Sequence, residues 1–206
     1  FIHTPHPEEV FKMKFDVIIG NPPYQLSDEG FGSSASPIYH KFIQQAKKLS
    51  PRFITMIIPA RWYSGGKGLD EFRNEMLNDK RIIELHDFPD TSDCFPGLNI
   101  RGGVCYFLWE KDYRGPCKVI THKGGTVGKV VERSLLEKKA EVFVRYNEGI
   151  DILKKVETFG EESFSKFVSS RKPFGLPTNF SEYKLKKEGP YNIKLSKGAR
   201  SMAGKT

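Results

Sequence analysis

The sequence predicts an α/β fold, and three observations carry this prediction. Short apolar runs that end in Gly or Pro recur along the first half of the chain, as expected of buried strands. Between the first runs lie segments with apolar residues at helical spacing, so that strand and helix alternate. Such alternation is typical of parallel sheets that are covered by their connecting helices. We therefore expect a mainly parallel sheet in the first 112 residues.

The first predicted strand ends in an unusually stiff sequence. Residues 15–19 form a nearly continuous apolar run, typical of a central parallel strand, and Gly-Asn-Pro-Pro closes it. Pro22 and Pro23 each fix their own backbone torsion and restrict the residue before them, so Asn21 is held in one conformation. The Asn21 amide and the Tyr24 ring are expected to project beyond the carboxyl end of the strand, where open α/β sheets bind ligands.

The next elements continue the alternation. The segment from Ser36 to Pro51 predicts a helix, with Ser36 as its N-cap, Pro37 at its first position and Pro51 as its stop. The apolar run at residues 53–62 predicts a second buried strand, and residues 68–77 predict another helix.

The later elements are shorter. Residues 81–88 and 102–110 predict two strands separated by a loop, and we expect the second to pair antiparallel at the sheet edge. Beyond residue 111, the segments at residues 117–133 predict a hairpin about a Gly-rich turn, and residues 148–159 predict an amphipathic helix.

The composition limits the class of protein. A chain of 206 residues with 38% hydrophobic residues can hold one substantial core and part of another unit. No run of eighteen apolar residues and no signal-peptide pattern occurs, so we expect no membrane span. Cys94, Cys105 and Cys117 are odd in number and lack a C-x-x-C pattern, which favours free thiols in a reducing cytoplasm and no metal site.

Positive charge is concentrated at the carboxyl-terminal end. Residues 171–206 contain nine Lys or Arg and two acidic residues, a net charge of +7 in a chain of net charge +8. Aromatic residues are interleaved with the cations, a mixture suited to phosphates and stacked bases, although a solvated surface segment would have the same composition. The residues expected to bind DNA are Arg171, Lys172, Lys184, Lys186, Lys187, Lys194 and Arg200.

The string Asn-Pro-Pro-Tyr is rare, because chance would place it in only on the order of one in a thousand chains of this length. A rigid turn after a strand is the alternative that needs no function. The wording FDVIIGNPPYQ resembles motif IV of the N6-adenine DNA amino-methyltransferases, and CFPGLNIRGGVCYFLW resembles their motif VIII region. IIPARW falls where the next strand and its loop belong. The likeness is greatest to Eco57I-type restriction-modification methylases and covers about residues 10–112.

The resemblance implies a Rossmann-like methyltransferase sheet and S-adenosylmethionine (AdoMet) as the cofactor. The catalytic residues that it implies are Asn21, Pro22, Pro23 and Tyr24, and Asn21 and Pro23 are also expected to contact the cofactor. An adenine flipped out of duplex DNA would stack between Tyr24 and Phe95. A phenylalanine such as Phe95 near the start of a strand is also typical of a core edge.

We expect the chain to be a fragment. The family's Gly-rich AdoMet-binding turn should precede NPPY, and the twenty residues before Asn21 contain no such turn. Residues 1–112 would then be the second half of a catalytic domain, residues 113–160 a hairpin and helix appendage, and residues 161–206 the start of a basic target-recognition region.

The partners implied are double-stranded DNA with a flipped adenine, and the rest of the parent methylase or an associated endonuclease. Two alternatives stay open. One is a protein-glutamine or other amide N-methyltransferase, because those enzymes also use NPPY to hold a planar amino group. The other is a non-catalytic DNA-binding specificity piece, whose methyl-transfer half is missing or supplied by another chain.

Overall fold

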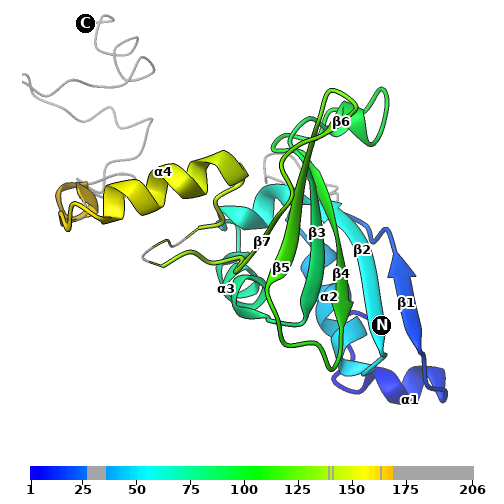
Figure 1. The fold of residues 1–206 in the computed structure, drawn as a ribbon. Helices are drawn as coiled ribbons and strands as arrows, with labels where there is room; N and C mark the ends of the chain where they lie inside the picture. Colours follow the sequence, from blue (N-terminus) through cyan, green and yellow to red (C-terminus); the bar gives the residue numbers. More distant parts are fainter. Residues whose placement is uncertain (27–35, 139, 141, 163, 169–206) are drawn as a thin grey trace, which may run out of the picture. The chain divides into compact units, whose positions relative to one another are not determined.

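The structure is a computed structural model that describes residues 1–26, 36–138, 140, 142–162 and 164–168. The chain divides into two compact units, of which the first is Phe1–Thr158 and the second begins at Phe159. In the second unit, the described residues contain the short 3-10 helix η3 (Phe164–Phe167). All the other helices and strands belong to the first unit (Figure 1).

A mixed β-sheet forms the centre of the first unit, in the order β1-β2-β4-β3-β5. β1 runs parallel to β2, and β3 runs parallel to β5, whereas β4 is antiparallel to both of its neighbours. Two short strands, β6 and β7, each pair antiparallel with β5. The strands are β1 (Val17–Gly20), β2 (Phe53–Pro59), β3 (Ile82–Phe88), β4 (Val104–Glu110), β5 (Cys117–Lys123), β6 (Thr126–Val127) and β7 (Val131–Arg133).

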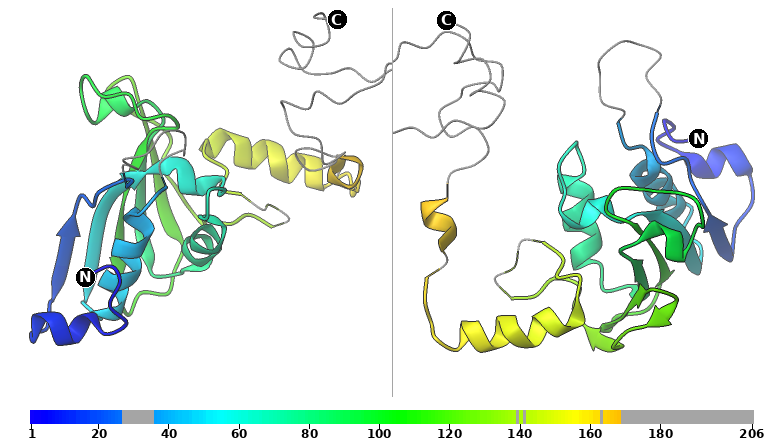
Figure 2. Two further views of the ribbon diagram at one scale, coloured as in Figure 1. Left: turned by 180° about the vertical axis from the view of Figure 1, so that it is seen from behind. Right: turned by 90° about the horizontal axis from the view of Figure 1, so that it is seen from above.

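Two helices cover one face of this sheet (Figure 2). Helix α2 buries Tyr39, Ile43 and Ala46, which recur at helical spacing, and α3 buries Phe72 and Met76. The helices are α1 (Pro7–Phe11), α2 (Tyr39–Lys48), α3 (Asp70–Asn78) and α4 (Asn147–Glu157), and two 3-10 helices, η1 (Ala60–Tyr63) and η2 (Thr91–Asp93), follow β2 and β3. Among the described residues, no helix is both long and apolar enough to cross a membrane.

The core lies on the helix-covered face. Alternate residues of the strands, such as Ile54, Leu85 and Phe107, are fully buried there. Side chains that point to the opposite face are less buried, and on β1 the exposed fractions of Val17 and Ile19 reach 45% and 78%. The sheet is therefore buried more completely on one face than on the other.

The predicted α/β class is confirmed. The sheet is mixed and not mainly parallel, because β4 is antiparallel to both of its neighbours, and two strand positions were wrong. β1 was expected to be central, and it is an edge strand because β2 is its only neighbour within the described chain. β4 was expected at the edge, and it lies between β2 and β3. The uninterrupted apolar run of β4 is the pattern that an interior strand requires.

Two element boundaries also differ from the prediction. Helix α2 begins at Tyr39, and Ser36 is not its N-cap, because Pro37 pairs with Gln25 in an isolated antiparallel bridge. Strand β2 ends at Pro59, after which the backbone turns into η1 instead of continuing as a strand. The three cysteines are free thiols, as predicted.

The predicted division into residues 1–112, 113–160 and 161–206 stays a prediction. The second of these ranges contributes β5, which is a strand of the same sheet and pairs in parallel with β3.

Candidate active site

The NPPY residues lie immediately beyond the carboxyl end of β1. Asn21 and Pro23 are exposed, Pro22 is buried and Tyr24 is half-buried. The Asn21 side chain has no hydrogen-bond partner in the part of the chain that the structure describes. Its amide is therefore exposed beyond the carboxyl end of β1.

Backbone hydrogen bonds hold the NPPY segment against the start of α2. The Ile38 N–H donates to the Tyr24 carbonyl over 3.2 Å, and the Leu26 N–H donates to the Ser36 carbonyl over 3.1 Å. Together with the prolines, these bonds fix the direction in which Asn21 and Tyr24 leave the strand.

The half-buried Tyr24 lies near two thiols. Burial raises the pKa of the Tyr24 phenol to about 12, and the nearby thiols of Cys94 and Cys105 add to this rise. Burial likewise raises the pKa values of Tyr39 and Tyr63. The Tyr24 hydroxyl is buried without a hydrogen-bond partner among the described residues. The Tyr24 ring is therefore uncharged across the physiological pH range.

Phe95 lies on the loop between β3 and β4. Its side chain is half-buried, and its N–H donates to the Thr91 carbonyl over 2.7 Å. The same loop brings Cys94 near Tyr24, but no ring contact joins Tyr24 to Phe95. The structure thus places the two predicted stacking residues on neighbouring segments, while their roles stay predictions.

A buried ion pair at the carboxyl end of β3 was missed from the sequence. Arg145 donates to both carboxylate oxygens of Asp87, with Nε–Oδ2 and Nη2–Oδ1 distances of 2.5 and 2.7 Å, and to the Gly102 carbonyl over 2.7 Å. Asp87 is fully buried, and burial raises the pKa of its carboxyl group against the opposing effect of Arg145. A charged residue inside each apolar segment was the available signal, but spacing cannot show that the two residues meet.

The predicted DNA-binding residues, all in the range 171–200, lie outside the described residues. Within the described part of the chain, no cluster of three or more His, Cys, Asp or Glu side chains could hold a metal ion.

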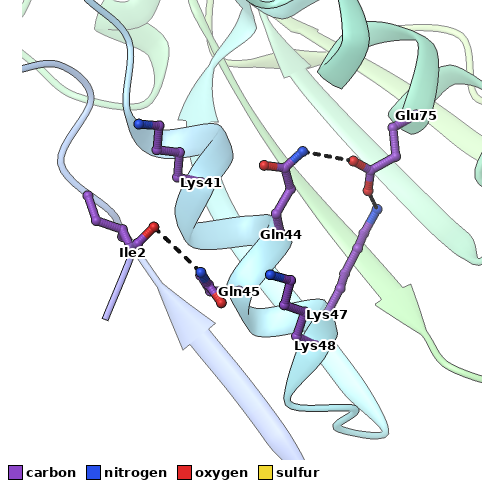
Figure 3. Close-up of a pocket in the computed structure, with 7 residues that line it drawn as sticks. All are labelled: Ile2, Lys41, Gln44, Gln45, Lys47, Lys48 and Glu75. Carbon is purple, nitrogen blue, oxygen red and sulfur yellow. Dashed lines mark hydrogen bonds and ion pairs between the residues drawn. The ribbon is translucent and has the colours of Figure 1, made fainter. Parts of the chain in front are cut away.

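A shallow pocket of about 560 Å³ lies along α2 and contains none of the predicted site residues (Figure 3). Its polar groups largely satisfy one another, because Glu75 accepts from Gln44 over 3.2 Å and from Lys47 over 2.6 Å. Gln45 donates to the backbone carbonyls of Ile2 and Thr4. This pocket is a weaker candidate for the active site than the exposed amide of Asn21, which bonds to no other residue that the structure describes.

Several known proteins resemble this chain. Residues 1–95 match the family described as Eco57I restriction-modification methylase. A Mycoplasma pneumoniae protein named as an uncharacterized adenine-specific methylase is 34% identical over 174 residues, which cover 79% of this chain and 41% of that protein. The chain thus spans less than half the length of this relative.

Solved structures of restriction-modification proteins are also similar. The methyltransferase subunit of a type I system from Streptococcus thermophilus has a TM-score of 0.42 and 14% identity, and the match covers 79% of this chain and 35% of that one. A structure from a type I system assembly has a TM-score of 0.40 and 15% identity over 73% of this chain and 31% of its own. The resemblance inferred from the sequence rests on the family and sequence matches and is confirmed: residues 1–95 are similar to the Eco57I restriction-modification methylases.

Proposed function

We propose that this chain is the base-binding part of a DNA methyltransferase that transfers a methyl group from AdoMet to adenine N6 in a restriction-modification system. The observation that carries the proposal is the exposed amide of Asn21, which lies beyond the end of β1, is followed by two prolines and has no hydrogen-bond partner among the described residues. The similarity of residues 1–95 to the Eco57I methylases supports the same reaction.

The chemistry of the amino group accounts for these residue types. The lone pair of adenine N6 is delocalised into the ring, so the nitrogen must become more tetrahedral as it attacks the methyl carbon. The Asn21 side-chain oxygen and the Pro22 carbonyl accept the two N6 hydrogens and stabilise the positive charge that develops there. The prolines keep both acceptors in place before the base arrives.

The base reaches these acceptors only outside the duplex. Unstacking costs a few kcal/mol, and stacking on an aromatic ring recovers roughly 1–3 kcal/mol per base. Tyr24 supplies one ring, and its phenol is neutral at physiological pH. Phe95, on the loop that passes near Tyr24, supplies the other.

AdoMet supplies an activated methyl group on its sulfonium sulfur. The exposed residues Asn21 and Pro23 fit a contact with it at the carboxyl end of the sheet. The rest of the cofactor site, we propose, belongs to the remainder of the parent methylase. In support, β1 exposes Ile19 and pairs with β2 alone in the part of the chain that the structure describes, whereas parallel strands are normally paired and covered on both faces.

The basic residues in the range 171–200 would contact the DNA phosphates. The free thiols support a reducing compartment such as the cytoplasm.

The deciding experiment supplies labelled AdoMet and DNA to the parent polypeptide, and then digests the DNA to nucleosides. We expect the label in N6-methyldeoxyadenosine, and none on a duplex whose adenines are already N6-methylated. Label in a glutamine side chain of a protein substrate would instead identify the amide methyltransferase alternative. Absence of transfer with intact DNA binding would identify the specificity piece.

A further inference from the structure

One carboxylate ties the loop after β3 to the hairpin of β5 and β6. The Gly124 N–H donates to Asp93 Oδ2 over 2.8 Å, and the Gly125 N–H donates to Asp93 Oδ1 over 3.2 Å. Each carboxylate oxygen thus accepts one hydrogen bond from a glycine N–H. The two segments lie side by side although they are about thirty residues apart in the sequence (Figure 1).

The hairpin presents these donors in a rigid turn. Gly124 and Gly125 have φ values of 59° and 71°, the left-handed backbone that a tight two-residue hairpin turn requires. Successive N–H groups in such a turn point to one side and form a site for an anion. The Thr126 hydroxyl donates to the Lys123 carbonyl over 2.6 Å, and this hydrogen bond across the turn stabilises it.

On the loop side, Asp93 and Phe95 belong to one compact turn. The Thr91 carbonyl accepts the N–H groups of Cys94 and Phe95 over 3.0 and 2.7 Å. The Thr91 hydroxyl donates to the Ile100 carbonyl over 3.1 Å and so joins the beginning of the loop to its end. A displacement of Asp93 therefore moves the backbone of Phe95 with it.

A stacked pair of rings also joins the strands from which the loop and the hairpin turn start. The rings of Phe88 and His122, near the carboxyl ends of β3 and β5, stack with centroids 4.3 Å apart and an interplanar angle of 5°. The loop starts directly after Phe88, and the turn starts directly after Lys123.

We propose that Asp93 is a positioning residue for base capture: by clamping the hairpin turn, it fixes the turn that carries Phe95. The effect on base binding rests on the proposed function, in which Phe95 stacks on the flipped adenine. The effect on the loop does not depend on that role. The two parts can therefore be tested separately.

The first test measures amide hydrogen exchange in the free chain, in Asp93→Asn and in the matched control Asp90→Asn. Asp93 uses both oxygens, so an amide must leave one glycine N–H without an acceptor. Asp90 accepts both bonds from Ser92 through Oδ1 alone, at 2.9 and 2.7 Å, so an amide keeps them. In Asp93→Asn we expect exchange at the Phe95 and Leu98 amides to rise about three- to tenfold, as for loss of one hydrogen bond. The control should leave exchange unchanged, and unchanged exchange in Asp93→Asn would overturn the clamp.

The second test measures binding of an oligothymidine that contains one 2-aminopurine, whose fluorescence is quenched when the base stacks. We expect Asp93→Asn to weaken this binding about three- to tenfold, and to weaken it no further when Phe95→Ala is already present. An equal loss on both backgrounds would show that Asp93 does not act through Phe95. If the unchanged chain causes no quenching, the stacking role fails, while the exchange measurement still decides the clamp.

Discussion

Replacing Asn21 by alanine should separate catalysis from folding. The Asn21 side chain is exposed and bonds to no other described residue, so its removal leaves no buried group without a partner. We therefore expect the free energy of unfolding to change by less than about 0.5 kcal/mol. In the proposed reaction, the same change removes one preorganised acceptor, and kcat should fall by roughly 10²–10³, equivalent to about 2.7–4 kcal/mol.

Two measurements check this contrast. Urea unfolding of the chain gives the stability, and turnover of the parent methylase with labelled AdoMet gives kcat. Gln25→Ala is the matched control, because Gln25 is an exposed amide four residues further along whose pairing with Pro37 is made by the backbone. It should change neither quantity. Turnover of Asn21→Ala within threefold of the unchanged enzyme would refute the catalytic role of Asn21. A loss of more than about 1 kcal/mol of stability would instead refute the inference that its side chain contributes nothing to the fold.

Three further predictions concern the ring of Tyr24, the buried carboxylate of Asp79 and the basic residues after Ser170. Tyr24→Phe should keep the affinity for the base, because the hydroxyl has no partner among the described residues. Tyr24→Ala should weaken that affinity about tenfold, as measured by the quenching of 2-aminopurine fluorescence. Burial opposes ionisation of Asp79, but hydrogen bonds from Arg81 and Lys47 and the Lys47 charge hold its pKa well below the usual range. The contribution of Asp79 to the free energy of unfolding is thus present above about pH 4 and is lost as the pH falls through its lowered pKa. Asp79→Asn should therefore reduce the free energy of unfolding at pH 7 by about 3 kcal/mol. In urea unfolding measured against pH, the variant should also lose less stability than the unchanged chain as the solution becomes acidic. Ending the chain at Ser170 removes a net charge of +7 and should abolish most DNA affinity and its salt dependence, whose slope is about −0.9 per phosphate; an unchanged slope would mean that the tail is only a solvated surface.

Strand β1 and the exposed segment after it could be predicted because they are encoded in consecutive residues. The apolar run of β1 identifies a strand, and the prolines fix the backbone beyond it whatever the rest of the fold does. The exposure of Asn21 agrees with this reasoning. The start of α2 was wrong for a related reason, since Ser-Pro is a good helix start locally, but pairing of Pro37 with Gln25 took precedence.

Contacts between distant segments could not be predicted in the same way. Asp87 and Arg145 are fifty-eight residues apart, and Asp93 and Gly124 are thirty-one apart. Hydrophobic periodicity tells which face of a strand is buried, but it carries no information about which charged residue of another segment will lie opposite. The interior position of β4 had a signal in its unbroken apolar run, although the run does not identify the two neighbours.

The prolines act on Asn21 independently of the neighbours of β1. Within the described chain, β1 pairs with β2 along one edge. Pro22 and Pro23 restrict the backbone covalently, so Asn21 keeps its direction whether or not β1 has a second neighbour. In the proposed clamp, Asp93 does the corresponding work for Phe95 through tertiary contacts. In the proposed reaction, the local sequence would therefore preorganise the amino-group acceptors, and the fold would preorganise the stacking ring.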